Sequence, residues 1–178
     1  MMVKKLRKTY GDVNAPSTVA LMRLIEAQSK TTVAKWTLDY AEQKMLPLFA
    51  KFCQNDKRPA HAIAAAREWL AGKVKLPYVK NIILNECHAA ARELDDIPVA
   101  QAAARAIGQS AGSIHAASHS LGLYFYAAAA VGYDRLGLDA SKAEYQAVAE
   151  EVCADYTAAL KAVSIENEPN PAKCKWNF

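Results

Sequence analysis

The sequence predicts an all-α fold, a single-domain array of about six to eight packed helices with an alanine-rich helical hairpin at its centre. Three observations lead to this prediction. Apolar side chains recur at three- and four-residue steps through most of the chain, and helix-capping residues precede these stretches. No stretch alternates apolar and polar residues as a strand does. Only 8% of the residues are aromatic while alanine is abundant, which favours closely packed helices.

Three parts are expected along the chain. Residues 1–16 have weak periodicity and several turn-forming residues, so they form an N-terminal segment. Residues 17–163 carry the helical pattern and form a single helical domain. Residues 164–178 are rich in proline and asparagine, which predicts an irregular C-terminal tail that Trp176 and Phe178 dock on the body. A chain of this length buries roughly 70% of the surface that its unfolded form exposes, so it needs no metal or disulfide to fold.

The first two helices have clear start signals. Ser17 is a suitable N-cap for a helix that runs to Gln28. Thr31 or Thr32 would cap the second helix, in which a broad apolar face repeats at three- and four-residue steps. Pro47 lies inside this stretch. Because proline lacks an amide hydrogen and its ring clashes with the preceding turn, a kink or a restart is predicted there.

The third helix and the last helix also have recognisable ends. Asn55 or Asp56 can cap the third, with Pro59 in its first turn and Gly72 closing it. Ser141 caps the last clear helix. A stripe along that helix is expected to pack in the core and consists of Tyr145, Val148, Val152, Tyr156, Ala159 and Val163.

Residues 86–130 form an alanine-rich block that carries three of the chain's four histidines. If the helix that begins at Pro98 continues through its glycines, small and polar residues share one side of it. The glycines would let another helix approach closely, so the polar members would be buried and would need partners. This stripe consists of Pro98, Gln101, Arg105, Gly108, Gly112, His115, His119, Gly122, Tyr126 and Ala129.

A helix over residues 77–94 is expected to supply the partner face. A turn around Asp95, Asp96 and Pro98 would fold this helix and the next into a hairpin, with the two polar sides facing each other. The polar side of the helix consists of Asn81, Asn85, His88 and Arg92, and the apolar side of Ile83, Leu84, Cys87 and Ala91.

The hairpin is expected to gather six residues that we call the polar seam: His88, Arg92, Arg105, Gln109, His115 and His119. We favour a hydrogen-bonded seam that fixes the register of the helices, then a patch that binds a partner or ligand, and then a metal site. His115 and His119 are four residues apart, so they could present two nitrogens to one zinc, with His88 as a third ligand. Against this interpretation, the chain has no HExxH motif, and residues 115–122 include no acidic residue.

No catalytic residue is predicted. The serines that flank the histidines stand in no GxSxG motif. Cys87 and His88 are consecutive on a helix and point about 100° apart, so they do not form a dyad. The four cysteines make no CxxC pair, which gives no support to a zinc knuckle or a redox motif. The chain is therefore more readily interpreted as a binding protein than as an enzyme, and no cofactor is expected.

The charge and hydropathy indicate the cellular location of the protein and the classes of partner that it does not bind. The formal net charge is +4, and the lysines are scattered apart from a short run of Lys4, Lys5, Arg7 and Lys8. We interpret this run as a solvated N-terminus rather than a nucleic-acid-binding surface. The N-terminus lacks the apolar core of a secretory signal, and no run approaches the ~18 apolar residues of a membrane span. A cytoplasmic protein with free thiols is expected, bound to neither nucleic acid nor a membrane.

The tetrapeptide Ala-Ala-Ala-Arg occurs three times, ending at Arg67, Arg92 and Arg105. The intervals are unequal, so they do not define a solenoid repeat. Alanines let helices pack tightly, and the arginine that follows can pair with an acidic residue. The expected acidic partners are Glu42, Asp56, Glu86 and Glu93.

Several stretches, in order between Trp36 and Tyr126, resemble a known family. WTLDYAEQKMLPLF and DKRPAHAIAAAREWLAGK lie in the early helices, and CHAAARE, AAARAIGQ and SIHAASHSLGLYFY lie in the centre. The set resembles the all-helical immunity proteins of bacterial polymorphic toxin systems, immunity family five. Outside the polar seam, the matching motif residues are Trp36, Glu42, Asp56, Arg58, Pro59, Arg67, Trp69, Gly108 and Gly122.

This resemblance implies a cytoplasmic protein that neutralises a cognate toxin by covering its active site. Two alternatives remain open. One is a structural helical interaction module in which the seam only locks the fold. The other is a metal- or small-ligand-dependent helical enzyme that uses His88, His115 and His119. Trp36 and Trp69 are expected to anchor the core, and Asp56 and Arg58 are expected to set a helix start. The oligomeric state does not follow from the sequence.

Overall fold

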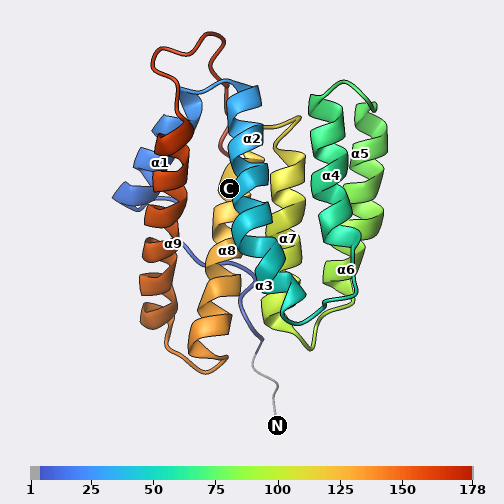
Figure 1. Ribbon diagram of the computed structural model, residues 1–178. Helices are drawn as coiled ribbons and strands as arrows, with labels where there is room; N and C mark the ends of the chain where they lie inside the picture. Colours follow the sequence, from blue (N-terminus) through green and yellow to red (C-terminus); the bar gives the residue numbers. More distant parts are fainter. Residues whose placement is uncertain (1–4, 178) are drawn as a thin grey trace.

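The computed structural model describes residues 5–177, and within this range it contains helices and no strand. The all-α prediction is confirmed. Figure 1 shows the arrangement. The elements are α1 (Pro16–Glu26), α2 (Lys30–Tyr40), η1 (Ala41–Met45), α3 (Leu46–Ala50), α4 (Arg58–Leu70), α5 (Leu76–Ile82), η2 (Ile83–Cys87), α6 (His88–Arg92), α7 (Pro98–Gly112), α8 (His119–Leu136) and α9 (Lys142–Val163).

Two of the helical rods contain a single turn of π-helix. The first rod is α2, η1 and α3, and the second is α5, η2 and α6. Pro47 is at the start of α3, directly after η1. A proline ring clashes with the carbonyl of the preceding turn, and a wider turn relieves that clash. The predicted restart at Pro47 therefore takes the form of a π turn inside a continuous rod.

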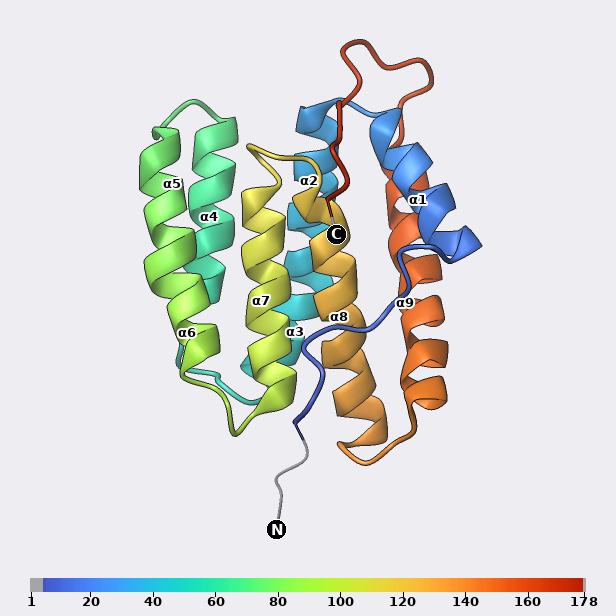
Figure 2. The ribbon, with the colours of Figure 1, turned by 180° about the vertical axis from the view of Figure 1, so that it is seen from behind.

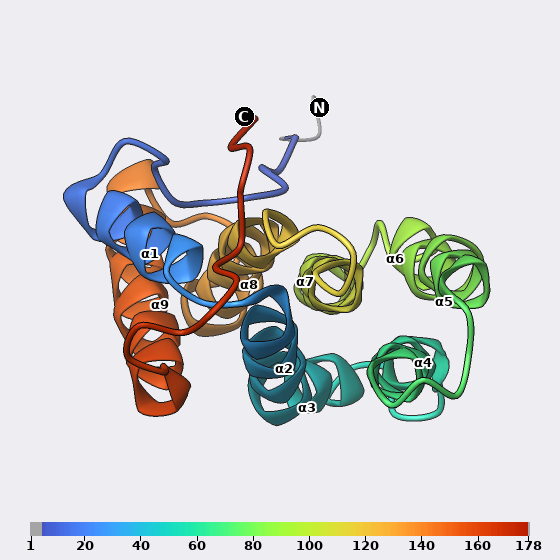
Figure 3. The ribbon, with the colours of Figure 1, turned by 90° about the horizontal axis from the view of Figure 1, so that it is seen from above.

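The helix α7 lies in the middle of the molecule. Viewed from above, it has α6 on one side, α8 on another, and α3 and α4 beneath it (Figure 3), and it contacts all four. The helix α8 packs in turn on α9, which α1 and α2 also contact. Most alanines of α7, and Ala127 to Ala130 of α8, are fully buried. Their small side chains let the helix axes approach closely, so the alanine-rich hairpin is central, as predicted.

The helix that begins at Pro98 does not continue through its glycines. It ends at Gly112, and the chain turns before α8 begins at His119. At this end Ser113 Oγ donates to the Ser110 carbonyl oxygen at 2.6 Å. Such hydroxyl bonds compete with the helical ladder, and glycine opposes helix continuation. The predicted single stripe is therefore wrong: its two halves lie on α7 and α8, which pack against each other as a second hairpin.

The π turn η2 alters the predicted sides of the rod over residues 76–92. Of the four residues expected on its apolar side, Ile83, Cys87 and Ala91 are buried, but Leu84 is 56% exposed. The prediction assumed 3.6 residues per turn throughout, whereas a π turn contains more residues and rotates the ones that follow. Leu84 is therefore a surface residue, and the prediction for it is wrong.

The helix caps agree with the sequence in part. Ser141 and Glu144 form the reciprocal capping box of α9, as the Ser141 prediction requires. The cap of α2 is Ser29, whose Oγ accepts from the Thr32 amide, rather than Thr31 or Thr32. No side chain caps α1, which begins at Pro16, so the Ser17 prediction is wrong. Proline at a first helical position has no amide hydrogen to satisfy, which lessens the need for a cap.

The N-terminal segment crosses α8 towards the start of α7 (Figure 2). Tyr10 holds it, stacking on Tyr145 with ring centroids 4.6 Å apart and meeting Tyr133 edge-on at 5.9 Å. The backbone at Gly11 has φ +108°, and a Cβ there would lie 2.7 Å from the Phe125 ring. Only glycine fits at this crossing. Lys4, part of the predicted basic run, lies outside the described residues.

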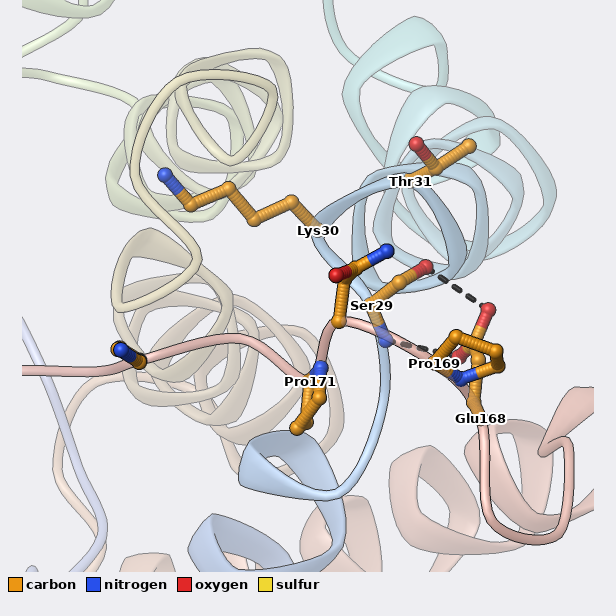
Figure 4. Close-up of a pocket in the computed structure, with 8 residues that line it drawn as sticks. Ser29, Lys30, Thr31, Glu168, Pro169 and Pro171 are labelled. Atoms are coloured by element: carbon orange, nitrogen blue, oxygen red, sulfur yellow. Dashed lines mark hydrogen bonds between the residues drawn. The ribbon is translucent and has the colours of Figure 1, made fainter.

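The C-terminal tail is irregular but bonded along its length. Gln28 Nε2 donates to the Ile165 carbonyl, and Gln28 Oε1 accepts from the Ile165 amide. Glu168 accepts hydrogen bonds from the Ser29 amide and hydroxyl at 2.7 and 2.8 Å (Figure 4). Trp176 Nε1 donates to Glu26 at 2.5 Å. Trp176 therefore docks the tail as expected, while Phe178 lies outside the described residues.

Candidate binding face

The polar seam comes from three helices and the turn between two of them. His88 and Arg92 lie on α6, Arg105 and Gln109 on α7, His115 in the turn after α7, and His119 at the start of α8. The helix α7 lies between α6 and α8 (Figure 3), and His88, Gln109 and His119 meet across these helices at Gly108, Gly122 and Gly112. Arg92 is exposed, and the other five are partly exposed. The seam is therefore part of the surface and is not trapped in a closed interface, contrary to expectation.

Three glycines provide space for the polar side chains of the seam. A Cβ at Gly108 would lie 2.4 Å from Cε1 of His88, and a Cβ at Gly112 would lie 3.2 Å from Cδ2 of His119. On α8, a Cβ at Gly122 would lie 2.5 Å from Oε1 of Gln109. Each glycine thus admits one seam side chain against the helix backbone. The sequence predicted close helix approach at these glycines, and the structure shows that they also hold ring and amide groups in place.

One hydrogen bond inside the seam orients a histidine. His119 Nδ1 lies 2.8 Å from Gln109 Oε1. An amide oxygen only accepts, so Nδ1 carries the proton, and Nε2 of the neutral ring is left as an acceptor. The ring of His115 lies next to that of His119, with centroids 5.3 Å apart. The pair therefore presents both donor and acceptor atoms at the end of α7.

Burial and nearby cations keep the seam histidines neutral. Burial is the main cause that lowers the pKa of His88 below its ordinary value of 6.5, and Arg105, Arg92 and His119 lower it further. Burial, His119, Lys80 and Lys30 lower the pKa of His115. Burial lowers the pKa of His119. A neutral imidazole can donate from one nitrogen and accept at the other, so the seam can bind either kind of group.

Two buried atoms of the seam have no hydrogen-bond partner among the described residues. They are Nε of Arg105 and Nδ1 of His115. Buried polar atoms in native proteins are nearly always paired, so an unpaired one calls for an explanation. Both atoms are themselves buried, but they belong to side chains that are partly exposed. This combination distinguishes the seam from ordinary surface.

The metal site considered as an alternative for His88, His115 and His119 has no geometric support. In the described part of the chain, no three histidine, cysteine, aspartate or glutamate side chains lie close enough together to hold a metal ion. His88 sits over Gly108 and His119 over Gly112, about one turn apart on α7. All four cysteines are free thiols, and the pKa of Cys87 is raised to about 12 by burial, which makes it a poor nucleophile.

Two arginines of α4, Arg58 and Arg67, form ion-pair clamps. Arg58 donates to both carboxylate oxygens of Glu93, at 3.0 and 2.7 Å, and to Asp56 at 2.7 Å. Arg67 donates to Asp39 at 2.9 Å and to Glu42 at 2.6 Å. The hydrogen bonds from Arg58 lower the pKa of the Asp56 and Glu93 carboxyls. The clamps join neighbouring helices.

The expected partners of the repeated arginines are only partly found. Glu42 pairs with Arg67 as expected, but Asp56 and Glu93 pair with Arg58. Glu86 lies 2.6 Å from Nδ1 of His61 instead. Of the other two repeats, Arg92 donates to the Leu84 carbonyl at 3.3 Å, and Arg105 makes no ion pair with any described residue.

The remaining motif residues have structural positions. Trp36 is buried and stacks on Tyr156, with ring centroids 4.0 Å apart. Trp69 is partly buried against the core. Pro59 is in the first turn of α4, and Asp56 Oδ1 accepts from the Arg58 amide at the same end. These contacts are those of core anchors and a helix start.

Comparison with known families identifies the chain. The model of the family described as Imm-5 like putative immunity protein matches residues 23–159. The chain belongs to this family. The match to this Imm-5 like family covers the end of α1, all helices from α2 to α8 and most of α9, including the polar seam and both arginine clamps. No curated protein and no solved structure matches the chain.

Sequence reasoning missed the cations that surround this Imm-5 like seam. Lys30 of α2 and Lys80 of α5 are close enough to lower the pKa of His115. Arg7 of the N-terminal segment lies near the other end of α7, where it lines a pocket together with Arg105. Their contribution depends on how the helices meet. Lys5, Arg7 and Lys8 of the short basic run are exposed, as predicted, and the sequence gives no signal that Arg7 lies near Arg105.

Proposed function

We propose that this chain neutralises a cognate toxin in the bacterial cytoplasm by binding it directly, with the polar seam at the centre of the binding face. Membership of an immunity protein family is the observation that carries the proposal. No helix among the described residues has the length and apolar character needed to span a membrane.

The seam is better suited to recognition than the rest of this surface. The side chains of His88, His119 and Gln109 are partly buried and lie against Gly108, Gly112 and Gly122, so little conformational entropy is lost when a partner orders these three. Two of its buried polar atoms are unpaired. By contrast, Arg58 is already paired with Glu93, and Arg67 is already paired with Glu42. A partner gains more from groups that have no bond to lose.

The charge around the seam indicates the chemistry of the partner surface. Lys30, Lys80, Arg92 and Arg105 surround neutral histidines. A complementary surface carries carboxylates and hydrogen-bonding groups, and electrostatic attraction speeds its association. An acidic inhibitor of a basic nuclease cleft presents free carboxylates, whereas here Glu93 is paired with Arg58 and cations surround the seam. This charge favours a cognate toxin outside the class of basic nucleases.

The test is co-purification with the product of the adjacent gene, the expected toxin, followed by measurement of affinity. A stable complex at micromolar concentration is expected. Arg92→Gln and Gln109→Ala should each weaken it about tenfold or more, as central contacts do. The matched control is Arg23→Gln, which removes the same charge from exposed Arg23 of α1. Absence of a complex at micromolar concentration would contradict direct binding, and equal effects of Arg92→Gln and Arg23→Gln would contradict the assignment of the face.

A further inference from the structure

A basic pocket lies between the N-terminal segment and the first turns of α7. Its volume is about 300 Å³. Four basic residues and one acidic residue line it, together with Tyr133. The charged residues are Lys5, Arg7, Lys8, Arg105 and Asp95.

Among the cations of the N-terminal segment, Arg7 is positioned by specific contacts, whereas Lys5 and Lys8 are exposed. The Tyr133 hydroxyl donates to the Arg7 carbonyl at 2.5 Å, and the Arg7 guanidinium lies 5.5 Å from the centroid of the Tyr10 ring. Tyr10 in turn packs on Tyr133 and Tyr145. The aromatic cluster thus fixes a basic stretch, far from α7 in sequence, against Arg105.

The charges that line this pocket are not neutralised by one another. Arg105 makes no ion pair with a described residue, and its Nε is buried without a hydrogen-bond partner. Asp95, the single carboxylate, accepts from Gln101 Nε2 at 2.8 Å and pairs with none of the four cations. Cations held together around a cavity repel each other unless an anion lies between them.

We propose that this pocket binds a phosphate group, either free or carried by a small molecule. A carboxylate bears one charge and is satisfied by a single guanidinium fork, whereas a phosphate bears nearly two charges and accepts from several donors. Two guanidinium and two ammonium groups match the second better. The pocket is at the small end of the size range of small-molecule sites, large enough for phosphate and a few more atoms. The proposal goes beyond toxin binding, since the isolated chain would bind this ligand.

The experiment is calorimetric titration of the full chain with inorganic phosphate and with ribose 5-phosphate at low salt. Saturable binding of one ligand per chain is expected, with an affinity that falls as salt increases because ion contacts are screened. Arg105→Gln should weaken binding at least about tenfold. Because Arg105 is partly buried, Arg7→Gln, on the exposed side of the pocket, provides a second variant with little risk to folding. Tighter binding of the sugar phosphate than of inorganic phosphate identifies a small-molecule ligand, and equal binding identifies free phosphate.

The control variant is again Arg23→Gln, which lowers the net charge by the same amount far from the pocket. Three results would overturn the proposal. One is no saturable binding at about 10 mM of either ligand, a concentration well above an affinity of biological use. Another is equal weakening by Arg105→Gln, Arg7→Gln and Arg23→Gln, which would indicate general attraction to a basic protein. The third is tighter binding of a triglutamate peptide than of both phosphates, which would assign the pocket to carboxylates.

Discussion

The helices α4 and α7 use the same tetrapeptide in opposite ways. Arg67 follows three alanines and pairs with two carboxylates, those of Asp39 and Glu42. Arg105 also follows three alanines, yet it has no ion pair and one unpaired buried nitrogen. The local sequence is identical, so the difference comes from the neighbouring helices. Satisfied arginines hold this fold together, and unsatisfied ones remain available to a ligand.

The largest effect on stability is expected at Gly108, which lies against the His88 ring of the polar seam. In Gly108→Ala the new Cβ would overlap the His88 ring, and displacing a packed side chain costs about 1–3 kcal/mol. Urea denaturation measures the loss. His88→Ala in the same chain removes the clash, so the double variant should be more stable than the sum of the single losses predicts. Additive losses would show that the His88 ring does not lie on Gly108.

A smaller loss is expected when a clamp is broken. Arg58→Gln removes the fork to Glu93 and the bonds to Asp56, which are partly exposed, and should cost about 1–2 kcal/mol. Arg58→Lys keeps the charge but cannot form the fork, so it should recover only part of the loss. Toxin affinity should not change. A loss of affinity with intact stability would show that Arg58 takes part in toxin binding.

The dependence of stability on pH should come from the three histidines of the polar seam. The folded protein lowers the pKa of His88, His115 and His119 below 6.5, so the unfolded chain binds more protons in this range. Their contribution to stability is complete above pH 6.5 and is lost as the pH falls towards the lowered values. Urea denaturation at several pH values between 8 and about 5.5 should show this slope. Replacing all three histidines by glutamine should flatten it, and an unchanged slope would assign it to other groups.

The smallest effect on stability is expected for Arg92→Gln. Arg92 is exposed and makes only one long hydrogen bond, to the Leu84 carbonyl, so the free energy of unfolding should change by less than about 0.5 kcal/mol. Thermal melting with Arg58→Gln measured alongside provides the comparison. A loss as large as that of Arg58→Gln would mean that Arg92 also acts as a structural clamp.

Several elements of the fold could be predicted because their signals are local. The capping box at Ser141, proline in the first turn of α4 and the turn before Pro98 depend on neighbours within one helical turn. The end of α7 at Gly112 was missed because the glycines do not specify whether a helix packs through them or stops. Leu84 was misplaced because a π turn changes the period without a marker in the sequence.

The candidate site shows the same division. The residue types and their three- and four-residue spacing were enough to select His88, Arg92, Arg105, Gln109, His115 and His119 as one set. They were not enough to decide whether the set was buried, exposed or joined by a metal, because those properties depend on distances between helices. The basic pocket was not predicted at all, because the residues that line it are far apart in the sequence.

By itself, the sequence determined that this chain is all helical, that alanine-rich helices form its centre and that its motifs resemble an immunity family. These properties follow from periodicity, composition and ordered local motifs. Only the tertiary structure decided which arginines are satisfied, which glycines hold the seam side chains and where the N-terminal cations lie. Electrostatic energy and steric fit depend on distances across the fold, and residues far apart in sequence meet only when the helices pack.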